Sequence, residues 1–124
     1  MGKTIGAVVA GVVLWGVLWN GGHAALAAAG VFVMGESISH VPTLVGLIVY
    51  SVLLSLLAGF VTATIKGAPD AMSAVKILAG VNLSIGILVE VLYWSLMPVW
   101  YHLIFLALVV PATLQGGMMK AGAA

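Results

Sequence analysis

The sequence has no cysteine and no arginine, and only 6% of its 124 residues are charged. Without cysteine the chain cannot form a disulfide bond, a thiolate nucleophile or a thiolate metal site. A net charge of +1 argues against a nucleic-acid partner, which needs a clustered basic patch. The lack of arginine argues against a small membrane transferase, because such an enzyme needs cationic side chains to hold an anionic cosubstrate. We therefore expect a protein that is not an enzyme.

Apolar residues are in excess and make up 64% of the chain. Soluble domains contain roughly 45–50% apolar and about 25% charged residues, so this composition indicates an integral membrane protein surrounded by the lipid bilayer. A membrane-spanning helix needs about 20 apolar residues, so four spans use most of the chain. We predict a single transmembrane domain over residues 1–124, folded as an all-α four-helix bundle.

The predicted spanning helices are separated by clusters of turn residues. They cover about residues 4–24, 43–65, 73–94 and 99–118. We expect an outer loop or short interfacial helix at about residues 25–42, and a possible break of the first span at Asn20–Gly22. The segment "KGAPDAMSAVK" predicts a short polar turn, since it combines Gly, Pro, Asp and two lysines. Pro111 falls inside the last span, where it should kink the helix.

The first apolar run has a competing interpretation as a secretory signal peptide. Lys3, the apolar segment that follows it and the small residues "ALAAAG" resemble the three regions of such a peptide. This alternative stays open beside the spanning helix.

The lysines determine the predicted orientation. With four spans, all of them fall on one side of the membrane: Lys3, Lys66, Lys76 and Lys120. The opposite loops contain no lysine or arginine, which is the bias that the positive-inside rule requires, so both termini are expected in the cytoplasm. Aromatic anchors agree, because they map to the outer ends of the spans: Trp15, Trp19, Tyr93, Trp94, Trp100 and Tyr101.

Small and polar residues recur at helical spacing on the two central spans. Ser51, Ser55 and Gly59 share one face of the second span, and Asn82 and Gly86 share one face of the third. Small residues let neighbouring backbones approach, and hydrogen bonds of Ser or Asn across helices add roughly 0.6 kcal/mol each. We interpret these five residues as helix-packing positions.

Ionisable residues gather on the predicted outer side. Imidazole and carboxylate ligands suit Zn, Cu or Fe, and five residues are candidates for such a metal site: His23, Glu36, His40, Glu90 and His102. Met34 and Met97 lie at a similar depth as possible soft ligands for Cu(I). No pair has the HxxxH or ExxH spacing of a site on one helix, and lone histidines are poor evidence for haem ligation. We therefore predict no bound metal or cofactor.

Glu90 and His102 have a simpler explanation. The short "SLMP" turn forces the third and fourth spans to run as antiparallel neighbours, with both side chains near the outer end. Ionisable residues inside a membrane usually pair with one another. We predict a polar contact between Glu90 and His102.

Three segments are also similar to a known group of proteins. "AGFVTATI", "GVNLSIGILVE" and "WSLMPVWYHLIFLALVVPATLQGG" resemble a family of small uncharacterised bacterial inner-membrane proteins with four predicted transmembrane helices. The resemblance covers about half of the chain and is most specific in the block from Pro98 to Gly117. It implies the same topology and a bacterial inner-membrane location, and it assigns no catalytic or binding residue.

Three functions are compatible with these observations. We favour a non-catalytic accessory or scaffold subunit that packs against other membrane protein subunits, because the loops are short and stripes of small residues suit helix contacts. The second is a small homo-oligomeric transporter or channel, for which Asn82 and a kink at Pro111 are the supporting features. The third is a membrane protein with a metal or cofactor on its outer face.

Overall fold

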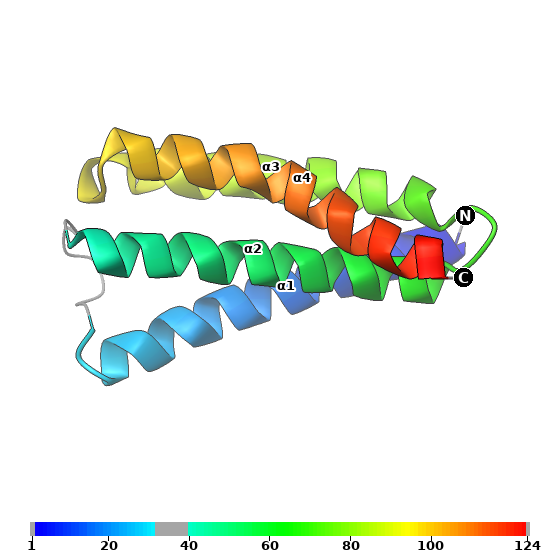
Figure 1. Ribbon diagram of the computed structural model, residues 1–124, viewed down its shortest axis with the longest axis horizontal. Coiled ribbons are helices and arrows are strands. Elements are labelled where there is room, and N and C mark those ends of the chain that lie inside the picture. The colour runs from blue at the N-terminus through cyan, green and yellow to red at the C-terminus, as the bar shows by residue number, and fades with distance from the viewer. Residues whose placement is uncertain (1, 32–39, 124) are drawn as a thin grey trace.

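The computed structural model describes residues 2–31 and 40–123, which form a bundle of long helices. In chain order the elements are α1 (Gly2–Ala28), α2 (Val41–Lys66), α3 (Ala71–Leu92), the 3-10 turn η1 (Trp94–Leu96) and α4 (Val99–Ala123). Successive helices run in opposite directions, so the start of α1 and the end of α4 lie at the same end of the bundle (Figure 1). Each of these four helices is long and apolar enough to cross a membrane. The predicted all-α four-helix architecture is thus confirmed over the described residues.

The first helix is longer than the sequence analysis predicted. α1 continues without interruption through Asn20–Gly22 and ends at Ala28, so the expected break is wrong. Asn20 bonds within the helix, and Gly22 packs against α2. The Asn20 side-chain amide donates to the carbonyl oxygen of Gly16 within the helix, at 2.8 Å. Gly22 lies against the ring of Tyr50, where a Cβ atom would meet the aromatic carbons, so the missing side chain is used for packing.

The other helix limits differ by a few residues from those expected. α2 starts two residues before position 43, and α3 ends at Leu92, two residues before position 94. α4 begins at Val99 as predicted and continues through Pro111 to Ala123. A proline is tolerated inside a membrane helix where neighbouring groups satisfy the freed carbonyl.

The connections at both ends of α3 are short and set its direction. α2 ends at Lys66 and is followed by Gly67, whose φ of +73° lies in the region that glycine adopts without strain and whose amide donates to the carbonyl of Ala63 at 2.9 Å. At the other end of α3, the turn η1 and Pro98 lead directly into α4. Because these connections are short, α3 lies antiparallel to both α2 and α4.

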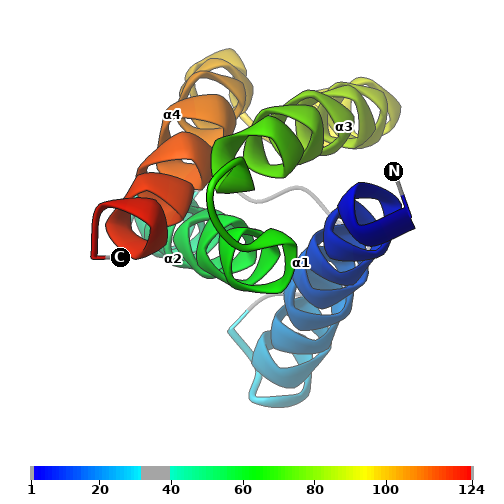
Figure 2. The ribbon, with the colours of Figure 1, turned by 90° about the vertical axis from the view of Figure 1, so that its right-hand side faces the viewer.

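The core lies between the helices, while their outward faces are also apolar. Trp15, Leu54, Leu78 and Phe105 belong to the main buried cluster, and each comes from a different helix. Viewed from the end, α2 lies between α1 and α4 (Figure 2). Large aliphatic side chains on the outside are more than half exposed, among them Leu53, Leu88 and Leu103. An apolar interior combined with an apolar exterior is what a protein surrounded by lipid requires, since lipid tails are as apolar as leucine.

Two glycines let α2 and α4 approach until their backbones touch. A Cβ atom on Gly59 of α2 would collide with the carbonyl oxygen of Thr113, and one on Gly116 of α4 would collide with the carbonyl oxygen of Leu56. Gly117 adds a third close contact, because a Cβ there would lie 2.6 Å from Val75 Cγ1 on α3. The packing of α4 therefore depends on residues without side chains.

Candidate functional site

The most distinctive polar feature of the bundle is a buried pair of ionisable residues. Glu90 lies in the last turn of α3 and His102 in the first turn of α4. The side chain of His102 is fully buried and that of Glu90 is 3% exposed. His102 Nδ1 contacts Glu90 Oε2, which confirms the polar contact predicted from the sequence.

The second ring nitrogen of His102 fixes the protonation pattern of the pair. Nε2 lies 2.9 Å from the backbone carbonyl oxygen of Trp94, and a carbonyl can only accept, so Nε2 carries a hydrogen and donates. A single further proton then lies between Nδ1 and the Glu90 carboxyl group. Either the carboxylic acid donates to a neutral imidazole, or an imidazolium donates to the carboxylate.

Two aromatic rings pack against His102. The Trp94 ring stacks on the His102 ring with centroids 4.4 Å apart and 12° between the planes. The Tyr101 ring meets His102 edge-on at 5.8 Å. A dry, enclosed hydrogen bond is stronger than one in water, so the arrangement can lock the α3–α4 turn or hold a proton.

The arrangement does not leave His102 available as a metal ligand. Both of its ring nitrogens are engaged, one with Glu90 and the other with Trp94. A metal ion needs a nitrogen lone pair, so the pair would have to rearrange before His102 could bind one.

The other metal-ligand candidates that the structure describes have contacts of their own. His23, on α1, is half-buried, with Nδ1 2.8 Å from the carbonyl oxygen of Trp19 and its ring against that indole. His40 is exposed at the start of α2, where its Nδ1 lies 2.8 Å from the hydroxyl of Thr43. Glu36 and Met34 lie outside the described residues, and Met97 packs beside an apolar cluster that includes Tyr101. Over residues 2–31 and 40–123, no three His, Cys, Asp or Glu side chains form a group able to hold a metal ion.

The five expected packing residues are all buried, and they face helices of the same chain. Ser51 donates to the carbonyl of Ile48 at 2.7 Å, and Gly59 contacts α4. A Cβ on Gly86 would lie 3.5 Å from both Phe105 and Leu106 of α4. Ser55 and Asn82 are buried with side-chain polar atoms that have no hydrogen-bond partner among the described residues. The structure therefore uses these faces within the bundle.

Sequence reasoning did not identify the partners in several contacts that join helices. The Thr62 hydroxyl donates to the carbonyl of Ala7 at 3.0 Å, and Tyr50 donates to the carbonyl of Leu18, which ties α2 to α1. Gly11 and Gly116 were also missed, although each allows a close approach. A glycine pair such as Gly116–Gly117 in an otherwise bulky helix is a signal that could have been read as a packing position.

Comparison with models of known protein families, with curated proteins and with solved structures finds no match to this chain. Over the described residues, the fold and the site define the class: an all-helical bundle of four helices, each long and apolar enough to cross a membrane, with a buried Glu–His pair at one end. The resemblance of the block from Pro98 to Gly117 to small bacterial inner-membrane proteins stays a prediction.

Proposed function

We propose that this protein is a non-catalytic accessory or scaffold subunit of the bacterial inner membrane, with both termini in the cytoplasm. In this role it docks against the membrane helices of a larger complex. The orientation rests on the four lysines, since the positive-inside rule relates lysine position to the cytoplasmic side.

The observation that carries the proposal is the outward face of α1. Eight exposed residues recur along it every three or four positions: Gly2, Gly6, Val9, Val13, Val17, Asn20, Ala24 and Ala28. We name this set the α1 face. Only 17% of the most apolar stretch of α1 is buried, compared with 33% to 44% for the other three helices. α1 is thus the helix with the most surface left for another chain.

The α1 face also differs in size from the outward faces of the other helices. Its eight residues are no bulkier than valine, although the neighbouring Ile5 of α1 is also exposed, whereas α2 exposes Leu53, Leu57 and Phe60. Small residues at i and i+4, such as Gly2 and Gly6, allow close approach of a second helix. Asn20 donates one amide hydrogen to Gly16 within α1, and its second N–H and its amide oxygen are better satisfied against a partner helix than in lipid.

A leucine scan of the α1 face tests this function. Gly6→Leu should release subunits that co-purify stoichiometrically in mild detergent, while the chain itself stays folded, because no described atom lies within 4 Å of a Cβ at Gly6. Gly80→Leu is the matched control, since Gly80 is exposed on α3 and its Cβ position is equally open among the described residues. A wild-type chain that purifies alone as a monomer would contradict the proposal.

The second candidate function is a small homo-oligomeric transporter or channel, and one observation favours it. Ser55 lies eleven residues before the end of α2 and Asn82 eleven residues after the start of α3, so the two occupy the same level of an antiparallel pair. Both are fully buried, and neither side chain has a hydrogen-bond partner within the described part of the chain. Unpaired polar groups at membrane depth are expensive and commonly mark a site for a polar guest. Purification as a stable homo-oligomer whose flux is abolished by Asn82→Leu would favour this function over the first.

A further inference from the structure

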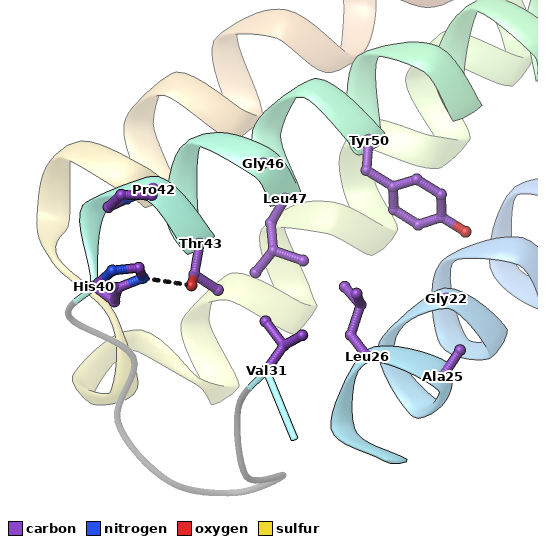
Figure 3. Close-up of a pocket in the computed structure, with 10 residues that line it drawn as sticks. All are labelled: Gly22, Ala25, Leu26, Val31, His40, Pro42, Thr43, Gly46, Leu47 and Tyr50. Atoms are coloured by element: carbon purple, nitrogen blue, oxygen red, sulfur yellow. Dashed lines mark hydrogen bonds between the residues drawn. The ribbon is translucent and has the colours of Figure 1, made fainter. Parts of the chain in front are cut away.

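An open-sided cavity of about 600 Å³ lies between α1 and α2, at the end of the bundle opposite the lysines (Figure 3). Leu26 of α1 and Leu47 of α2 form apolar walls, and Tyr50 lies at the deep end. Gly46 keeps the space open, because a Cβ at that position would have no described atom within 4 Å. The volume is in the range of roughly 300–1,000 Å³ that ligand sites occupy.

The length of the cavity matches a lipid chain in one leaflet. It extends along α2 from Pro42 to Tyr50, which are eight residues apart and therefore separated by about 12 Å along the helix. One leaflet contributes about 15 Å of hydrocarbon. The deep end carries no free hydroxyl, since Tyr50 donates its proton to the carbonyl of Leu18. The inner part of the cavity thus suits a hydrocarbon chain.

The shallow end has the opposite character. His40 and Thr43 lie there, joined through Nδ1 and Oγ1 at 2.8 Å, beside the amino end of α2. The amino end of a helix carries a partial positive charge, which favours phosphate. In the first turn of α2 the amides of Val41 and Thr43 are the ones left for an anion, because Pro42 has no N–H and Leu44 donates to the carbonyl of His40.

We propose that this cavity binds one phospholipid of the surrounding membrane, with an acyl chain between Leu26 and Leu47 and the phosphate beside His40 at the amino end of α2. The inference rests on the membrane placement proposed above. It names a lipid site that is separate from the α1 face and from the Glu90–His102 pair. Binding of the phospholipid requires both the apolar walls at Leu26 and Leu47 and the partial positive charge at the amino end of α2.

Photolabelling in vesicles tests the site. The full chain is inserted into phosphatidylethanolamine–phosphatidylglycerol vesicles that contain a phospholipid with a diazirine in its acyl chain, and labelled peptides are mapped by mass spectrometry. Wild-type protein should concentrate the label on the segments around Leu26 and Leu47. Gly46→Leu should lower that labelling by at least about tenfold, since its side chain displaces about three buried CH2 groups of the lipid. The control variant Gly80→Leu changes a residue of α3 and should leave this labelling at the wild-type level.

Carbonate extraction of the same vesicles separates the two possible failures. Protein that carbonate removes from the vesicles was not inserted in the bilayer, and this result would overturn the membrane placement. An inserted chain that is labelled evenly over all four helices, or that loses no label in Gly46→Leu, would overturn the lipid site alone. Wild-type protein should also gain thermal stability with added phospholipid, and Gly46→Leu should not. Replacement of His40 by Asp should weaken labelling at Leu47, because a carboxylate there repels the phosphate.

Discussion

At the residue scale, the Glu90–His102 pair shows how the chain places two ionisable side chains in an apolar bundle. The cost of removing each group from water is offset only if its hydrogen-bonding capacity is met inside. Here the carboxyl group of Glu90 meets Nδ1 of His102, and Nε2 meets the carbonyl of Trp94. That carbonyl is available because the chain leaves the α-helical pattern after Leu92 and forms η1. The turn and the pair therefore stabilise each other.

A double-mutant cycle on this pair should reveal strong coupling. Truncating either partner leaves the other buried without its partner, so Glu90→Ala and His102→Ala should each lower the free energy of unfolding by about 3 kcal/mol or more. The double variant should lose about 1–3 kcal/mol less than the sum of the two, because both single variants lose the same interaction. Unfolding in mixed detergent–SDS micelles provides the measurement. If the loss in the double variant equals the sum of the two single losses, the contact contributes nothing to the free energy of unfolding.

At the element scale, the α2–α4 packing depends on glycines that face a backbone. Gly59 and Gly116 each lie where a side chain would collide with a carbonyl oxygen of the opposite helix. With no hydrophobic driving force between helices in lipid, close van der Waals packing of this kind is the main source of association. The face with Ser51, Ser55 and Gly59 is therefore occupied by α4 of the same chain, so substitutions there report on the fold of the single chain.

Leucine at either of these glycines should separate the two helices. Gly59→Leu and Gly116→Leu should each reduce the free energy of unfolding by about 1–3 kcal/mol or more, because the backbone has to move to admit the side chain. Gly80→Leu serves as the control, since it adds the same side chain to an exposed position of α3. Thermal aggregation of the detergent-solubilised variants, read against wild type, gives the comparison. Equal stability of Gly59→Leu and Gly80→Leu would contradict the close contact.

At the scale of the whole molecule, the two ends of the bundle carry different residues: lysines at one end, and a buried polar pair and a cavity at the other. Lys3, Lys66 and Lys120 lie at the end where α1 begins, where α2 meets α3 and where α4 ends. The opposite end carries the Glu90–His102 pair and the cavity beside His40. If the positive-inside rule orients the bundle, these two polar features face away from the cytoplasm.

Cysteine accessibility tests this orientation directly, because the chain has no cysteine of its own. An impermeant maleimide added to intact cells should label His40→Cys and should not label Asp70→Cys until the membrane is permeabilised. Both positions are exposed, so the difference reports on the side of the membrane and not on burial. Labelling of position 70 from outside intact cells would reverse the assigned orientation.

The sequence by itself determined the number of helices, their approximate limits and the Glu90–His102 contact. Composition alone predicts helices here, since a backbone in lipid has to satisfy its hydrogen bonds internally. Short connections then fix which helices are neighbours, and the "SLMP" turn brings Glu90 and His102 together.

Only the tertiary structure decided which faces meet. It showed that α1 continues through Gly22, that Gly59 meets α4, and that α1 and α2 leave a cavity beside Gly46. The physical reason is that lipid and the protein interior are equally apolar, so the sequence contains leucine at both kinds of position. Leu53 lies on the outside and Leu54 in the core, and hydrophobicity alone does not distinguish them. Which of the two is buried depends on the fit of side-chain volumes between helices, and this fit exists only once the helices are packed.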